Sequence, residues 1–145
     1  MRITNVKVTT AGTKITALYQ NAEDERINKI TFENNDTNPV NIIHALQELQ
    51  NEAKEISELS DDSSIEIKGT TVKYKDAQTI VQLSIYRHVD GDKGYSFSTP
   101  KMYDVHEDDE LILPEEFMSK LSTVRSEALK YLKHHTDQMG LSLDA

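Results

Sequence analysis

The chain has 145 residues, no cysteine and a formal net charge of −9, from 16 basic and 25 acidic side chains. This length fits one domain with its own core, and the lack of cysteine excludes disulfides, thiolate zinc sites and cysteine nucleophiles. No segment approaches the ~20 apolar residues of a membrane helix, and the N-terminus has no signal-peptide core, so we expect a soluble cytoplasmic protein that does not bind membranes.

The first third of the chain alternates apolar and polar residues as β-strands do. Val6 and Val8 share one face in "ITNVKVTT", and "KITALYQ" alternates again after a short turn. A polar connector, "NAEDER", leads to "INKITFE", where Ile30 and Phe32 share a face. The short connections predict three antiparallel strands.

A helix is predicted next, with Asn38 placed to cap it and Pro39 at its first position. Its apolar stripe consists of Ile42, Leu46, Leu49, Ala53, Ile56 and Leu59. Four further strands are predicted around residues 65–67, 72–74, 79–87 and 95–97. A second helix follows Pro114, with a stripe of Phe117, Leu121, Val124, Ala128 and Tyr131.

The order βββ-α-ββββ-α predicts an α+β fold of antiparallel sheets in a single domain over residues 1–139. Two similar units, 1–60 and 64–139, each end in an amphipathic helix, and residues 140–145 form a flexible acidic tail. Both helices are expected to pack on one face of the strands and to leave the other face uncovered.

Three polar clusters resemble functional sites but are interpreted structurally. His134 and His135 point about 100° apart on a helix and do not converge on one metal ion. "DGDKGYSF" lacks the glycine and the bidentate acid of a calcium loop, and is interpreted as a hairpin turn. The carboxylates of "HEDDELILPEE" are interpreted as a solvated loop or an interaction surface. No catalytic motif occurs, so we expect no enzyme activity, no metal and no cofactor.

Strand parity separates the core residues from a second, polar face. If Ile65, Ile67, Val72, Val81, Leu83 and Ile85 point toward the helices, then Lys68, Lys73, Lys75 and Tyr86 point away from them, and Tyr74 belongs to the core. In the first half the corresponding face offers Lys7, Lys14 and Lys29. Tyr95 and Phe97 are further candidates whose parity the sequence leaves open. Lysines that track phosphates beside rings that stack on bases suit single-stranded nucleic acids. The alternative is an ordinary solvated sheet face with lysines for solubility.

The chain resembles small proteins that bacteriophages and prophages encode among their replication and recombination genes. This likeness rests on "MRITNVKV", "IEIKGTTVKYKDAQTIVQLSIYR", "SFSTPKMY" and "TDQMGLSLDA". The repeated plan of a strand meander and a helix is also similar to the Whirly and PUR-repeat class of single-stranded nucleic-acid binders. That resemblance implies DNA on the sheet face with Lys68, Lys73, Lys75 and Tyr86, a homo-oligomer supported by the helices, and, for a phage protein, the host cytoplasm.

The leading hypothesis is therefore a non-catalytic, phage-type single-stranded DNA-binding protein. Leu141, Leu143 and Asp144 in the tail are candidate contacts to a recombinase or replication protein, by resemblance to phage single-strand binders. The alternative is a small acidic phage inhibitor of a host defence protein, which uses its carboxylates as a DNA mimic or in the manner of an anti-CRISPR protein.

Overall fold

The computed structural model describes residues 2–20, 26–75, 78–104 and 111–138, and it is an α+β fold with one open, mostly antiparallel sheet. The strands are β1 (Arg2–Thr9), β2 (Gly12–Gln20), β3 (Ile27–Asn34), β4 (Ser64–Lys75), β5 (Gln78–Asp90), β6 (Lys93–Ser98), β7 (Met102–Tyr103) and β8 (Leu111–Ile112). They lie in the order β3-β2-β1-β4-β5-β7-β8, and β6 also pairs with β5.

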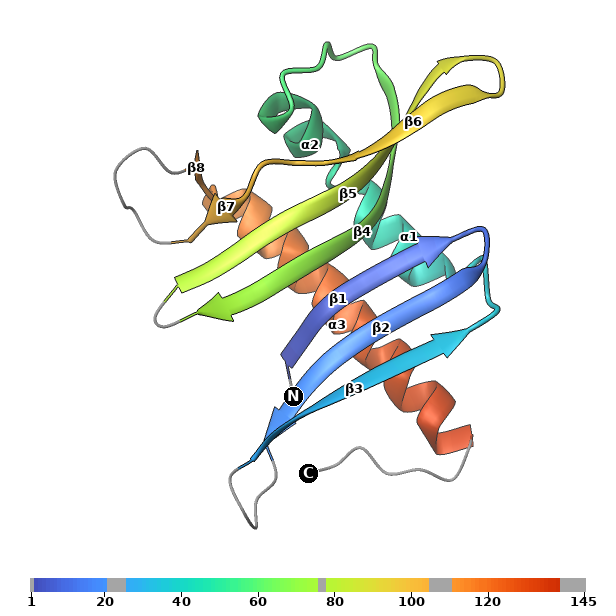
Figure 1. Ribbon diagram of the computed structural model, residues 1–145, viewed down its shortest axis with the longest axis vertical. Helices are drawn as coiled ribbons and strands as arrows, with labels where there is room; N and C mark the ends of the chain where they lie inside the picture. The colour runs from blue at the N-terminus through green and yellow to red at the C-terminus, as the bar shows by residue number, and fades with distance from the viewer. Residues whose placement is uncertain (1, 21–25, 76–77, 105–110, 139–145) are drawn as a thin grey trace.

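The helices are α1 (Val40–Gln47), α2 (Gln50–Ile56) and α3 (Glu115–Gln138). All three lie behind the sheet in Figure 1, so no helix of the described residues covers the face turned toward the viewer. Within the described part of the chain, no helix is long and apolar enough to cross a membrane.

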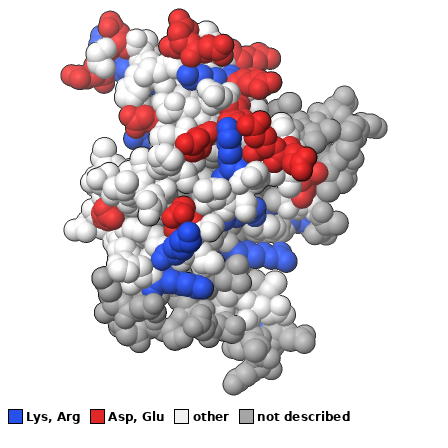
Figure 2. All heavy atoms as spheres, turned by 180° about the vertical axis from the view of Figure 1, so that it is seen from behind, with Lys and Arg blue, Asp and Glu red and all other residues white. Residues whose placement is uncertain are grey.

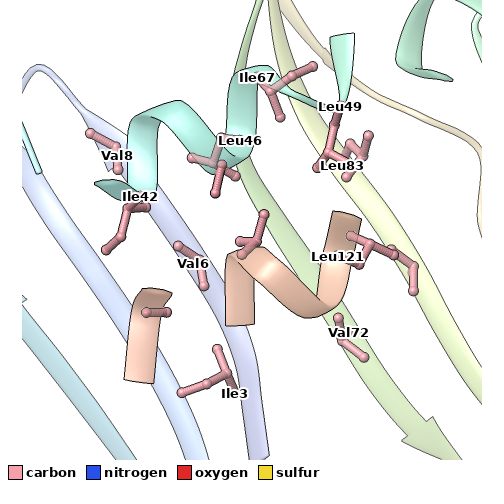
Figure 3. Close-up of a cluster of buried hydrophobic side chains, with 14 of the residues drawn as sticks. Ile3, Val6, Val8, Ile42, Leu46, Leu49, Ile67, Val72, Leu83 and Leu121 are labelled. Carbon is pink, nitrogen blue, oxygen red and sulfur yellow. The ribbon is translucent and has the colours of Figure 1, made fainter. Parts of the chain in front are cut away.

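The core lies between the back of the sheet and the helices. Figure 3 shows Leu46 of α1 and Leu121 of α3 beside strand residues such as Val6 and Leu83, and all four side chains are at most 4% exposed. Every residue of the two predicted helix stripes is buried or packed against this core, as the helical periodicity indicated.

The two predicted groups of strands share one sheet. β1 pairs with β4 through Asn5 with Thr71, Val6 with Thr70, and Lys7 with Gly69. The helices pack across this junction, because α1 and α2 contact β4 whereas α3 contacts β1 and α1. Each half of the chain is therefore covered in part by a helix from the other half.

The first predicted helix is two helices in the structure, separated by a turn at residues 48–49. Pro39 precedes α1 as its N-cap residue in an extended conformation, and no side chain caps the helix. The prediction that Asn38 caps it was wrong. The reason is local: the Asn38 N–H donates to Asp36 Oδ1 at 2.9 Å in a turn that ends before the helix begins.

The strands predicted at residues 65–67 and 72–74 are one strand, β4. Gly69 does not break it, but lies at a register shift between Ile67 and Gly69. A Cβ atom there would sit 2.3 Å from the Val6 carbonyl oxygen, so the glycine lets β1 approach β4 closely. The short strands β7 and β8, which pair in parallel, were not predicted because two residues show no periodicity.

Two glutamines continue the hydrogen bonding of β4 where β1 ends. The Gln47 amide donates to the Ile67 carbonyl at 2.9 Å and accepts from the Ile67 N–H at 3.0 Å. Gln50 donates to the Ile65 carbonyl at 3.1 Å. These contacts satisfy a strand edge that β1 leaves open and fix the helices against β4.

Several predicted features lie outside the described residues. They are residues 21–25 of the polar connector, residues 105–110 of the acidic cluster, and the tail with Leu141, Leu143 and Asp144.

Candidate functional site

The strand register brings the predicted lysines to the uncovered face. Lys7 lies opposite Lys14 on β2 and opposite Gly69 on β4, and Lys14 lies opposite Glu33 on β3. Their neighbours that point to the back of the sheet, such as Val6, are buried. The lysines of this face are Lys7, Lys14, Lys29, Lys68, Lys73 and Lys75.

Three connected hollows run across this face. One of ≈ 560 Å³ is lined by Lys14, Lys29, Lys73 and Lys75. A second of ≈ 370 Å³ is lined by Lys7 and Lys14. These two share Asn5, Lys14 and Thr71 as lining residues.

The third hollow, of ≈ 640 Å³, is lined by Lys7, Lys68 and Tyr86 and shares Lys7, Thr9 and Ser84 with the second. The three hollows therefore form one continuous depression across β3, β2, β1, β4, β5 and β6. We name it the lysine trough, defined by the six lysines above and Tyr86.

Most lysines of the trough are not neutralised. Among the described residues, Lys7, Lys29, Lys73 and Lys75 take part in no ion pair, whereas Lys14 lies 3.5 Å from Glu33 and Lys68 lies 2.6 Å from Glu66. Glu33 and Glu66 are thus the acids that face these lysines in the described strands. The trough carries a net positive charge on a protein whose total charge is −9.

Glu66 contacts both Lys68 and His88 at one end of the trough. Its Oε2 contacts Lys68 Nζ at 2.6 Å, and its Oε1 contacts His88 Nε2 at 3.0 Å. The hydrogen bond from Lys68, followed by that from His88, holds the pKa of the Glu66 carboxyl below its usual value despite partial burial. The carboxylate therefore stays ionised at neutral pH.

Tyr86 lies in the same hollow and is held by packing. The outer end of its phenol covers Gly94, where an added Cβ would meet the hydroxyl oxygen at 2.5 Å. The ring also meets the edge of the His88 ring, with centroids 4.9 Å apart. The tyrosine is thus fixed on the uncovered face, as strand parity predicted.

Tyr95 and Phe97 are placed differently. They lie opposite Arg87 and Ile85 in β5, so their side chains point to the back of the sheet, away from Tyr86. Arg87 donates a hydrogen bond to the Tyr95 hydroxyl at 3.0 Å, and Phe97 packs against the core. Neither side chain therefore shares the face of Tyr86, although Phe97 also borders the ≈ 640 Å³ hollow.

Sequence reasoning missed His88, Ser96 and Ser98, which line the trough beside Tyr86. His88 has the same parity as Tyr86, so strand parity could have placed it on the uncovered face. The serines required the β5–β6 register, which places Ser96 opposite Tyr86. Gln82, whose parity places it on this face, donates to the Thr99 carbonyl at 3.0 Å.

The opposite side of the molecule carries an acidic region. Figure 2 shows the helix-bearing side, where Asp and Glu gather over its upper half. Glu52 on α2 and Glu116 on α3 both form ion pairs with Lys120, so the positive charge of Lys120 is neutralised on this side. The upper half of this side is thus acidic, whereas Lys and Arg lie on its lower half.

No three His, Asp or Glu side chains gather as metal ligands in the part of the chain that the structure describes. His135 instead stacks on Tyr131, with ring centroids 4.1 Å apart, and contacts the Tyr131 carbonyl through Nδ1 at 2.9 Å.

Comparison with protein-family models, with curated proteins and with solved structures finds no match to this chain.

Proposed function

We propose that this protein binds single-stranded DNA along the lysine trough, without catalysis, in phage-type replication or recombination. The observation that carries the proposal is the cross-strand pair of Lys7 and Lys14 on an uncovered sheet face. Like charges directly opposite one another destabilise a sheet. Glu33 lies 3.5 Å from Lys14 and offsets part of this repulsion. An anionic ligand beside Lys7 would offset the rest.

The chemistry of the trough suits a single strand. Unpaired lysines from β1, β3 and β4 can follow phosphates without reading a sequence, and Tyr86 offers a ring on which a base can stack. Threonine and serine hydroxyls between them can bond to sugars and base edges. A duplex offers phosphates but no exposed base faces, so the tyrosine favours single strands.

The net charge of −9 does not oppose this proposal, because many acids gather over the upper half of the helix side, away from the trough. The acidic region of the helix side repels a polyanion and so favours its approach to the lysine trough. The same repulsion disfavours binding of DNA to that region.

The proposal also includes a likeness to known families, a homo-oligomer and a contact made by the C-terminal tail. An uncovered antiparallel face with helices behind it supports the likeness to Whirly and PUR-repeat proteins, with two related units. The homo-oligomer rests on the same resemblance. The tail contact to a recombinase or replication protein rests on the resemblance alone.

The acidic helix side favours a second candidate, an inhibitor that presents carboxylates to a host protein that binds nucleic acid. This function would use the side shown in Figure 2 and would need no lysine trough.

The test is a titration of fluorescently labelled 20-nucleotide oligothymidine, and of a duplex of equal length, followed by anisotropy at 50 mM and 200 mM salt. Saturable binding that prefers the single strand and weakens with salt supports DNA binding. Equal affinity for the duplex contradicts the assignment to single strands, and no binding at micromolar protein favours the inhibitor.

A further inference from the structure

The hollow between β4, β5 and β6 differs from the rest of the lysine trough. Its lining includes Lys7, Lys68, Tyr86, His88, Ser96 and Ser98. The volume of ≈ 640 Å³ lies in the range of about 300–1,000 Å³ that is typical of small-molecule sites. We call it the β6 hollow, and its combination of ring, cations and hydroxyls matches the parts of one nucleotide.

Tyr86 is positioned before any ligand binds. Gly94 lies beneath the outer end of its ring, and the His88 ring lies against it. No hydrogen bond fixes the Tyr86 hydroxyl among the described residues, so packing alone holds the ring. A base that stacks there meets a surface whose conformational entropy is already reduced.

Glu66 marks the place of an anion in the β6 hollow. Two groups that can carry positive charge, Lys68 and His88, each contact a different oxygen of this carboxylate, at 2.6 and 3.0 Å. A phosphate presents oxygens to such donors in the same way. Lys7, which is in no ion pair within the described residues, lines the same hollow.

We propose that the β6 hollow is a subsite for one unstacked nucleotide, with the base on Tyr86 and the phosphate on Lys68 and Lys7 in place of the Glu66 carboxylate. This inference rests on the proposed function, since it assigns one nucleotide of the bound strand to a defined position. Glu66 then acts as an internal competitor that weakens binding of a lone phosphate, so the base and the phosphate must bind together.

The test uses deoxyadenosine 5′-monophosphate as the probe and deoxyribose 5-phosphate as the probe without a base. Chemical shifts of the ¹⁵N-labelled full chain are followed during titration with each. The nucleotide is expected to shift amides of residues 84–88 and 94–98 saturably, and the sugar phosphate to bind these residues at least fivefold more weakly. Shifts confined to the strands of Lys29 and Lys73, or equal binding of both probes, would overturn the subsite.

Two variants separate stacking from packing. Tyr86→Leu removes the ring but keeps an apolar side chain at this position, so nucleotide affinity should fall about 5- to 150-fold. Tyr86→Phe keeps the ring and should bind as the parent does. If Tyr86→Leu binds the nucleotide unchanged while its spectrum shows a folded protein, the base does not stack on Tyr86 and the inference is wrong.

A matched pair of variants tests the competitor. Glu66→Gln releases Lys68 and should raise nucleotide affinity about 1.4- to 5-fold, the range of an exposed ion pair. Glu33→Gln releases Lys14 at the other end of the trough, with the same change in net charge, and should leave nucleotide affinity unchanged. Equal gains for both variants would show an effect of net charge only and would overturn the role of Glu66.

Oligothymidine binding distinguishes failure of the subsite from failure of the proposed function. Oligothymidine bound without any shift from the nucleotide overturns the subsite and leaves the proposed function intact. Nucleotide bound in the β6 hollow without oligothymidine binding supports the subsite as a nucleotide site and contradicts single-stranded DNA binding. Absence of both overturns both.

Discussion

The salt dependence of DNA binding is the sharpest test of the lysine trough. Each phosphate neutralised on a single strand contributes about −0.7 to the slope of log K against log salt. The four lysines that take part in no ion pair among the described residues, Lys7, Lys29, Lys73 and Lys75, are free to make this contribution. Counting these four alone gives an expected slope of about −2.8, so affinity should fall about 50-fold between 50 and 200 mM salt.

The perturbation is the double variant Lys73→Gln/Lys75→Gln, which removes two of these four charges from β4. The slope should then become about −1.4, and the fall in affinity over the same salt range about 7-fold. Both lysines are on the uncovered face, so their loss should not disturb the core. The assay is oligothymidine anisotropy at four or more salt concentrations.

The control is Lys54→Gln/Lys130→Gln, which removes the same charge from α2 and α3 on the other side of the sheet. It should lower affinity slightly through net charge and leave the slope at its original value. Two results would refute the assignment of phosphates to the trough. One is a slope of log K against log salt in Lys73→Gln/Lys75→Gln that equals that of the parent protein, and the other is an equal decrease of this slope in the control variant.

Three further predictions concern stability and are read from urea unfolding. Lys7→Thr should raise the free energy of unfolding by about 0.2–1 kcal/mol because it removes the repulsion from Lys14. The same variant should bind DNA more weakly. A lower free energy of unfolding would contradict the repulsion between the two lysines. Gly69→Ala should lower the free energy of unfolding by about 1–3 kcal/mol, since its Cβ meets the Val6 carbonyl, whereas an unchanged value would show that β1 can shift freely. Tyr131→Phe removes the hydroxyl that accepts from Asn34 and donates to Asp36, at a cost of about 1–3 kcal/mol. The Asn38 N–H and then this hydroxyl lower the pKa of Asp36, so the stability they provide is present above pH 3.8 and lost as pH falls through the lower, folded-state pKa. The difference between parent and Tyr131→Phe should therefore shrink toward pH 2, and a constant difference would contradict the linkage.

The sequence predicted the elements that depend on periodicity. The apolar stripes of both helical segments identify residues that are buried or packed on the core, and the alternation of the first strands does so for Val6, Val8 and Phe32. Parity also placed Lys73, Lys75 and Tyr86 correctly on the face opposite Val72 and Leu83, because alternate residues of a strand point to opposite faces.

Features that depend on contacts between distant segments were not predictable in this way. The continuity of β4 through Gly69 depends on the approach of Val6, and the orientation of Tyr95 and Phe97 depends on the register of β6 against β5. The pairing of Glu66 with His88 likewise joins residues 22 positions apart. A single sequence gives the local pattern but not these long-range choices.

The packing of helices across the β1–β4 junction affects how the protein forms on the ribosome. β1, β2 and β3 end at Asn34, but α3, which contacts β1 and bonds to Asn34 through Tyr131, ends only at Gln138. The 104 residues between these points (138 − 34) take roughly 5–20 s to synthesise at ~5–20 residues per second. During this interval α3 cannot yet pack on the apolar face of β1, β2 and β3. The lysines on the opposite face of these strands help to keep the nascent sheet soluble.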